Sequence, residues 1–203
     1  YDVAAETWAA IAPLATARYG MDAVEIGGLI YLPGGNDDTD DPGDGGTFLN
    51  ELRIYNPASN TYSTGAAMPA ALAYASAVAY NGKLYVLGGW TNAGMPSDAV
   101  YIYDPSTNTW SSGASMAQGR SYAAAAAVGD LIYIAGGYTG GSTVLSSLEI
   151  YDPLADSWSA GPDLPIDALA PYGDGALSGR YFIVFNGGPI AYAGGTTLSC
   201  GTD

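Results

Sequence analysis

Histidine is absent from this chain of 203 residues, and cysteine occurs once, as Cys200. Without histidine, the chain lacks the commonest general base near neutral pH and the commonest transition-metal ligand. A serine–histidine–aspartate triad and a histidine-ligated copper or haem site are therefore excluded. A single cysteine forms neither an internal disulfide nor a cysteine-rich zinc site. No apolar run reaches the roughly 18 residues that a membrane-spanning helix needs, so no direct membrane span is expected.

Basic residues are also scarce, because 5 Lys and Arg stand against 20 Asp and Glu and give a formal charge of −15. Such an acidic surface repels phosphate backbones and anionic lipids, so nucleic acid is not an expected partner. An acidic surface rich in threonine, serine and glycine suits a secreted, extracellular or cell-surface protein, or one adapted to salt. We expect an extracellular or cell-surface location on that basis.

Glycine, proline and aromatic residues are abundant. The chain holds 29 Gly and 12 Pro, which interrupt regular structure, and 17 Tyr, 4 Trp and 3 Phe, which need burial. Many short strands joined by turns fit this composition better than a helical bundle or a disordered chain. The composition therefore predicts an all-β fold.

An internal repeat organises the sequence. Tyrosines at 1, 55, 103 and 151 lie 54, 48 and 48 residues apart, and a tryptophan or tyrosine follows each by seven residues. In each repeat unit, an apolar strand-like piece ends in a glycine doublet. The doublets are Gly34-Gly35, Gly88-Gly89, Gly136-Gly137 and Gly187-Gly188. A period of about 48 residues with four strand-like pieces per unit is typical of a β-propeller.

Each unit is predicted to contain four antiparallel strands, which we call A to D in chain order. In the second unit they are Ser76–Tyr80, Lys83–Leu87, Asp98–Tyr103 and a strand that starts near Thr109. Asn81-Gly82 between the first two is a strong hairpin signal. In the other units we predict strands over 23–26, 29–32, 48–55 and from 61, over 125–128, 131–135, 147–151 and from 157, and over 175–177 and 180–185.

These landmarks resemble those of kelch-repeat β-propellers of the bacterial type. The resemblance lies in the glycine doublet, in Tyr-Asp-Pro at 103–105 and 151–153, and in Trp110 and Trp158 seven residues after the tyrosines. It covers nearly the whole chain and implies a kelch-type propeller. The chain departs from the pattern at Tyr62, which replaces a tryptophan, and at Leu72 and Ala168, which replace the arginine present as Arg18 and Arg120.

We expect residues 1–203 to form one propeller domain, with units at about 14–62, 63–110, 111–158 and 159–203, the last completed by residues 1–13. A strand at Thr7–Ile11 would then close the last unit. Four repeat units predict either a closed four-blade ring or part of a larger propeller, and kelch propellers more often have six or seven blades. Because the sequence starts at Tyr1, we expect a processed, truncated or partial chain.

Binding is expected on the face formed by the B–C and D–A loops, because the A–B turns are tight and offer little to a ligand. Irregular loops on a rigid scaffold are the usual place for binding. The candidate ligand-binding residues are Arg18, Tyr19, Asn36, Trp90, Arg120, Tyr122 and Tyr138. Aromatic and arginine side chains suit contacts with a peptide or a sugar. The alternative is that the arginines tie neighbouring loops together and the aromatic rings cover blade edges.

The first B–C loop carries six extra residues and five aspartates between positions 37 and 44. Oxygen ligands on a glycine-containing loop suit Ca²⁺, and Asn36, Asp38, Asp40 and Asp44 are the candidate ligands. No closing glutamate follows at the twelfth place, since position 47 is Thr. A solvated acidic loop is the alternative. Apart from Ca²⁺, we expect no cofactor.

The sequence therefore predicts a non-catalytic module that binds a protein or a glycan, and no catalytic residue is assigned. One alternative is a structural subunit of a larger extracellular assembly. Another is a carbohydrate-active enzyme or sugar isomerase built on the same scaffold, with two carboxylates facing each other across a sugar. The copper chemistry of related oxidases does not carry over, because the chain has no histidine.

Overall fold

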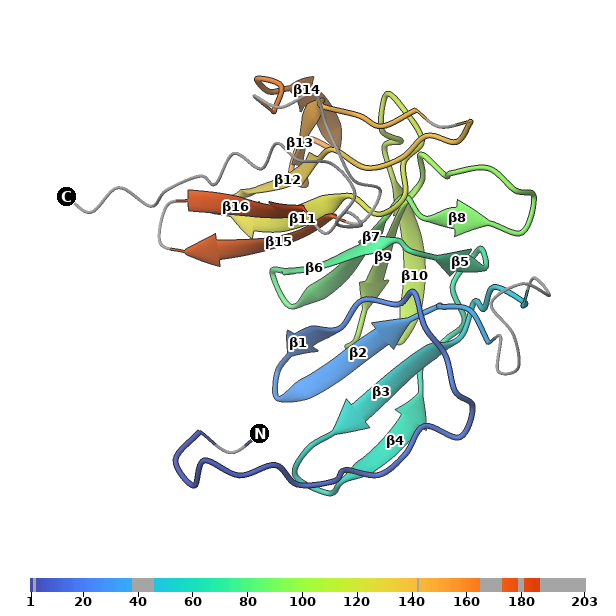
Figure 1. The fold of residues 1–203 in the computed structure, drawn as a ribbon, viewed down its shortest axis with the longest axis vertical. Coiled ribbons are helices and arrows are strands. Elements are labelled where there is room, and N and C mark those ends of the chain that lie inside the picture. The colour runs from blue at the N-terminus through green and yellow to red at the C-terminus, as the bar shows by residue number, and fades with distance from the viewer. Residues whose placement is uncertain (2, 38–45, 142, 165–172, 179–180, 187–203) are drawn as a thin grey trace, which may run out of the picture.

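A computed structural model describes residues 1, 3–37, 46–141, 143–164, 173–178 and 181–186, the last two ranges as backbone. In these ranges every regular element is a β-strand, which Figure 1 shows and which confirms the all-β prediction. No helix in the described part of the chain is long and apolar enough to cross a membrane.

Three four-stranded antiparallel sheets and two strand pairs make up the fold. Strands β6, β7 and β12 have the predicted bounds, and nearly all other bounds lie within two residues of the prediction. The exception is β3, which starts at Leu52 where a strand from Phe48 is predicted. The sheets are β1 (Val24–Ile26), β2 (Leu29–Pro33), β3 (Leu52–Asn56) and β4 (Thr61–Thr64); β6 (Ser76–Tyr80), β7 (Lys83–Leu87), β9 (Val100–Asp104) and β10 (Thr109–Gly113); and β11 (Ala124–Val128), β12 (Leu131–Ala135), β13 (Leu148–Asp152) and β14 (Ser157–Ala160). The pairs are β5 (Leu72–Ala73) with β8 (Trp90–Thr91), and β15 (Gly173–Ser178) with β16 (Tyr181–Asn186).

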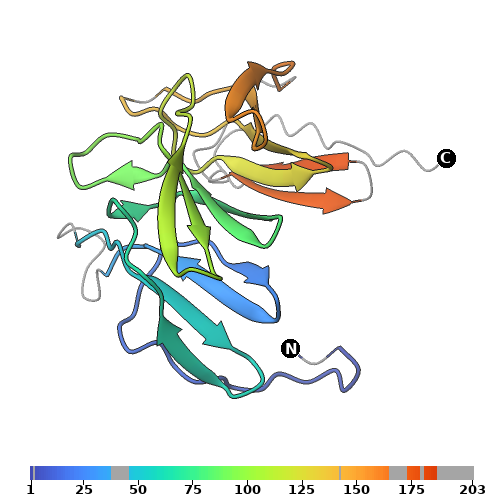
Figure 2. The same ribbon diagram turned by 180° about the vertical axis from the view of Figure 1, so that it is seen from behind.

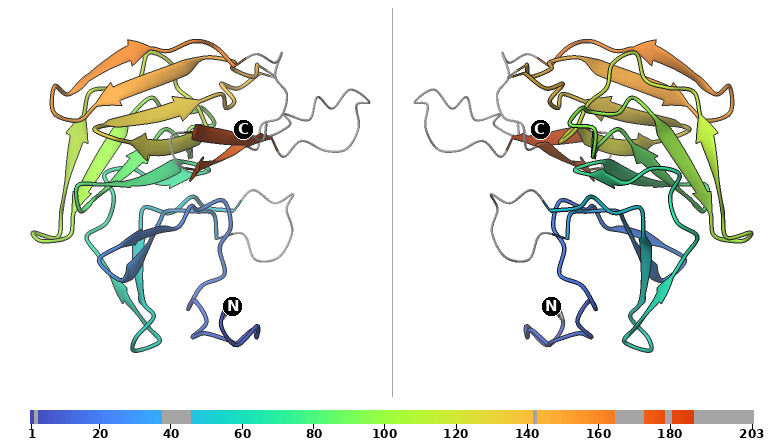
Figure 3. Two further views of the ribbon diagram at one scale, coloured as in Figure 1. Left: turned by 90° about the vertical axis from the view of Figure 1, so that its left-hand side faces the viewer. Right: turned by 90° about the vertical axis from the view of Figure 1, so that its right-hand side faces the viewer.

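The sheets follow one another as blades in an arc, as Figures 1 and 2 show from opposite sides. Their innermost strands are neighbours in the order β1, β6, β11 and β15, which is the arrangement of a propeller. Figure 3 shows the blades from the side.

The N-terminal segment lies beside β3 and β4 (Figure 1), where the backbone N–H of Ala12 donates to Oδ1 of Asn60 at 2.7 Å. The described residues 7–11 form an isolated bridge at Thr7 and no strand, so the predicted strand Thr7–Ile11 is not present there. Most of the predicted last unit, 159–203, lies outside the described residues, so its completion by residues 1–13 stays a prediction.

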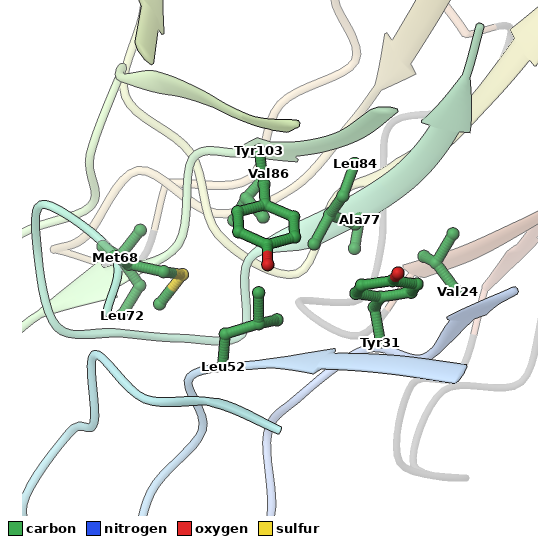
Figure 4. Close-up of a cluster of buried hydrophobic side chains, with 9 residues drawn as sticks. All are labelled: Val24, Tyr31, Leu52, Met68, Leu72, Ala77, Leu84, Val86 and Tyr103. Carbon is green, nitrogen blue, oxygen red and sulfur yellow. The ribbon is translucent and has the colours of Figure 1, made fainter. Parts of the chain in front are cut away.

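The apolar core lies between the blades. Strand β7 alternates its side chains, with Leu84 and Val86 packed toward the first blade and Tyr85 and Leu87 toward the third. Figure 4 shows the cluster between the first and second blades, in which Leu84 and Val86 lie across from side chains of β1, β2 and β3. Burying one such aliphatic side chain contributes about 1.5–3 kcal/mol. Burial on both faces explains why β7 is apolar at every position from Leu84 to Leu87.

A repeated corner joins each blade to the segment before it. At the β9–β10 turn, Asn108 has φ 54° and its Oδ1 accepts hydrogen bonds from the hydroxyl of Tyr103 at 2.7 Å and the N–H of Ala66 at 2.7 Å. The indole of Trp110 donates to the carbonyl oxygen of the same Ala66 at 2.7 Å. The third blade repeats this corner with Tyr151, Asp156, Trp158 and Ala114. The repeated tyrosine and tryptophan therefore act as clamps between blades.

The glycine doublets allow neighbouring blades to approach closely. Gly88 has φ 68°, and a Cβ atom there would collide with the carbonyl oxygen of Arg120 in the next blade. Its neighbour Gly89 donates its N–H to that same oxygen at 2.8 Å. Gly34 and Gly35 repeat the arrangement against Leu72. A side chain at the first glycine would separate the blades, which explains the doublet.

Candidate functional site

The residue after each of the first three glycine doublets joins three chain segments on the B–C and D–A loop face. Asn36 bridges Tyr19 and Phe48, and Tyr138 bridges Ser121 and Val144. Trp90 takes the same place in the middle blade, where β8 pairs with β5 and Trp90 bridges Pro96. Backbone pairing therefore fixes equivalent side chains at the same height on three successive blades.

A cavity of about 240 Å³ lies on this face, and aromatic rings supply most of its lining. The rings of Trp90 and Tyr138 are stacked, with centroids 5.6 Å apart and planes 19° apart. The rings of Tyr74 and Tyr122 lie 4.2 Å apart at 31°. The lining residues are Asn36, Phe48, Tyr74, Trp90, Tyr122 and Tyr138. Half-buried rings around a hollow offer a large contact area at a small cost in side-chain entropy.

Two of the cavity tyrosines have a backbone conformation that tyrosine rarely adopts. Tyr74 and Tyr122 have φ 56° and 55°, and the equivalent residue of the first blade is Gly20, with φ 64°. The left-handed conformation costs a side-chain-bearing residue about 1–2 kcal/mol, which glycine avoids. The N–H of Tyr122 donates to the carbonyl oxygen of Tyr74 at 2.9 Å, and that of Tyr74 to Gly20 at 2.5 Å. The fold thus holds two bulky rings at positions that glycine fills without strain.

These tyrosines also border the centre of the arc. Tyr74 and Tyr122 line a second hollow of about 450 Å³, which is also lined by residues 20–23 just before β1 and by residues at the starts of β6 and β11. The rest of its lining is Met21, Asp22 and small residues, and Asp22 is the charged residue among them. Two backbone N–H groups, those of Ala23 and Ala77, donate to the carboxylate of Asp22 at 2.8 and 2.9 Å. Asp22 therefore joins the first two blades here.

The two arginines, predicted as ligand-binding residues with loop-tying as the alternative, lie beneath the B–C and D–A loop face, and the structure supports the alternative. Arg120 is 1% exposed, and its guanidinium donates to the carbonyl oxygens of Gly136 and Ser147 at 2.9 and 3.2 Å and to the carboxylate of Glu149. Burial lowers the pKa of this guanidinium, and the charge of Glu149 opposes that effect. Arg120 is therefore occupied inside its own blade and holds the loops together.

Arg18 has the same role in the first blade. Its side chain is 1% exposed and donates to Glu51 at 2.5 Å and to the carbonyl oxygen of Gly34 at 3.3 Å. Burial disfavours the charged form of Glu51, but the hydrogen bonds and charges of Arg18 and Arg53 outweigh burial and lower its pKa. The sequence could not separate this supporting role from a surface role, because both place arginine just before strand A.

Four of the seven predicted binding residues, Asn36, Trp90, Tyr122 and Tyr138, line the cavity, and Tyr19 lies at its edge. The ring of Tyr19 is 41% exposed and lies 6.1 Å from that of Tyr74, and its hydroxyl accepts a hydrogen bond from Asn36 at 3.0 Å.

Two lining residues, Phe48 and Tyr74, are not among those predicted from the sequence. Aligning the repeats would have identified Tyr74, because it follows Leu72 by two residues just as Tyr122 follows Arg120. Phe48 could not be placed from the sequence, because its position depends on where the longer first B–C loop ends in space.

The predicted calcium site falls largely outside the described residues. Asp38, Asp40 and Asp44 are not among them, and no group of three or more metal-ligating side chains occurs in the described ranges. Asn36 is described and is 5% exposed. Calcium binding stays a prediction, and a melting temperature that a chelator leaves unchanged would contradict it.

Comparison with known proteins gives consistent matches. The profile of the KLHDC2/KLHL20/DRC7 Kelch-repeats domain matches residues 1–173. F-box/kelch-repeat protein At1g67480 of Arabidopsis thaliana is 33% identical over 92 residues, which is 45% of this chain and 23% of that protein. Kelch repeat protein M-T8 of Myxoma virus (strain Lausanne) is 36% identical over 89 residues, which is 44% of this chain and 16% of that protein.

A solved structure, that of YjhT, superimposes with a TM-score of 0.77 at 19% identity and covers 88% of this chain and 62% of that chain. At this identity the likeness concerns the fold. The matched part of this chain spans less than a quarter of the length of these two curated relatives.

Proposed function

Because this chain belongs to the kelch-repeat family, we propose that it is a non-catalytic binding module that holds a protein partner on its B–C and D–A loop face. The observation that carries this proposal is the pair of tyrosines held at positive φ on the edge of the aromatic cavity. Strained conformations persist where the surrounding structure enforces them, and they cluster at binding sites. Gly20 shows that the fold itself does not require a ring at that position.

The chemistry of the cavity supports contact with a partner more than proton transfer. Its described lining is five aromatic rings and the amide of Asn36. Tyrosine and tryptophan are the residues most enriched at the energetic centres of protein interfaces. The same rings would also stack on a sugar, so a glycan remains the alternative ligand, and a carbohydrate-active enzyme or sugar isomerase the alternative function.

A second candidate function, a structural subunit of a larger extracellular assembly, has one observation in its favour. Val3, Trp8 and Ile11 are 81%, 83% and 57% exposed and lie in one short segment beside the first blade. Exposed apolar side chains that cluster in this way mark docking surfaces. Under this candidate, substitution of Trp8 by Ser would dissociate an assembly and leave binding at the cavity unchanged. The excess of acidic residues supports an extracellular or cell-surface location, which fractionation of the source cells tests.

The experiment selects peptides from a displayed random library against the wild-type protein and measures their affinities for two variants. We expect Trp90→Ala to weaken binding by about 30-fold or more, as at interface hot spots. Leu154→Ala is the matched control, because Leu154 is 95% exposed in the β13–β14 turn on the opposite face. Peptides that bind Trp90→Ala as tightly as wild type, or that lose affinity with Leu154→Ala, would contradict the proposal.

A further inference from the structure

The aromatic cavity presents rings whose faces carry negative potential. Phe48, Tyr74, Trp90, Tyr122 and Tyr138 supply five of its six lining residues. A cation within about 6 Å of such a ring centre is attracted by the ring quadrupole, most strongly by tryptophan. Two ring pairs, with centroids 4.2 and 5.6 Å apart, border the same hollow.

The cations of the protein itself are already engaged. In the described part of the chain, each of the four basic side chains forms an ion pair with a carboxylate: Arg18 and Arg53 with Glu51, Lys83 with Asp104, and Arg120 with Glu149. The two arginines nearest the face have side chains that are 1% and 0% exposed. An acidic peptide or a terminal carboxylate would therefore find no cation at this cavity among the described residues.

A described carboxylate, that of Asp37, instead belongs to the next residue after the lining residue Asn36. Asn36 and Phe48 both line the cavity, and the eleven residues that join them in sequence include five aspartates, of which Asp37 is described. The carboxylate of Asp37 accepts a hydrogen bond from the N–H of Thr47 at 2.8 Å, beside both lining residues. The carboxylate of Asp37 and the net charge of −15 favour the approach of a basic segment.

We propose that the partner's contact residue in this cavity is cationic, an arginine within a basic segment of the partner protein; this inference rests on the proposed function. Arginine fits better than lysine because its guanidinium is planar, weakly hydrated and stacks on aromatic faces. The stacked rings of Trp90 and Tyr138, 19° from parallel, offer such a flat surface.

The test uses the peptides whose binding depends on Trp90 in the selection above. We expect arginine to be enriched in them, and replacement of one arginine by citrulline, its neutral isostere, to weaken binding about 5- to 30-fold. The affinity is expected to fall as salt rises, because the charges on this face are solvated. Trp90→Phe should lower affinity less than Trp90→Leu, and this comparison separates a ring effect from general loss of bulk.

The outcomes separate this inference from the proposed function. If no selected peptide depends on Trp90, the proposed function fails and the inference fails with it. If Trp90-dependent peptides lack arginine, or if citrulline binds as tightly as arginine, the inference alone is overturned. Trp90-dependent binding of neutral oligosaccharides, with no peptide bound, would identify a glycan site and overturn both. Because citrulline is placed in the peptide, this arm does not depend on the folding of a protein variant.

Discussion

Removal of one partner of the buried pair between Arg120 and Glu149 tests how the loop face is supported. In Arg120→Leu, the carbonyl oxygens of Gly136 and Ser147 and the carboxylate of Glu149 lose their donor in a buried site. Breaking a buried ion pair in this way costs about 3–5 kcal/mol. For a chain of this size that corresponds to a fall in melting temperature of roughly 6–20 °C.

The double variant distinguishes a buried charge pair from simple packing. The double variant, Arg120→Leu with Glu149→Leu, leaves no unpaired charge. We therefore expect it to be no less stable than either single variant, whereas two independent sites would show the sum of the two single costs. The middle blade, where Leu72 replaces the arginine, shows that a leucine fits this position. Urea unfolding at neutral pH measures the three free energies. Single variants that cost under about 1 kcal/mol, or costs that simply add, would refute the reasoning.

Three further changes follow from the structure. Gly88→Ala should lower the free energy of unfolding by about 2–5 kcal/mol, because the residue has φ 68° and its new Cβ would collide with the next blade. Gly82→Ala is the control in the same urea assay: it has φ 71° but open space around it, so it should cost only about 1–2 kcal/mol. Trp158→Phe should destabilise the protein by about 1 kcal/mol or more, because the Phe ring cannot donate to the inter-blade carbonyl, and an unchanged unfolding midpoint would contradict the clamp. Hydrogen bonds from Ser106 and then Lys83 lower the pKa of Asp104 from 3.8 to about 2, so its contribution to stability is complete above about pH 4 and is lost as the pH falls toward 2. NMR titration should show Ser106→Ala raising that pKa, and an unaltered value would disprove the cause.

Much of the fold could be predicted because the repeat places the same physical requirement at the same register. The hairpin signal Asn81-Gly82 and the doublet Gly88-Gly89 predict both ends of β7 from the sequence alone, and the strand has those ends. The repeated tryptophan of the third blade, Trp158, makes a contact between blades through its indole. The described residues 7–11 hold a bridge at Thr7 and no strand, and their pairing with the last unit stays a prediction, because most of that unit lies outside the described residues.

The candidate site was harder to predict because it depends on which side of a loop a residue faces. Arg120 and Tyr122 lie two residues apart in one loop, yet one is buried beneath the face and the other lines the cavity. The positive φ of Tyr122 turns its side chain toward the neighbouring Tyr74, and no sequence pattern indicates that conformation for tyrosine. Phe48 joins the cavity from the far end of the longest B–C loop.

The most direct test of the account is to locate a selected, Trp90-dependent peptide on the protein by intermolecular nuclear Overhauser effects. We predict contacts between the peptide's arginine side-chain protons and the ring protons of Trp90, Tyr122 and Tyr138. Contacts confined to the A–B turns at Gly82 and Gly129, on the opposite face, would contradict the account.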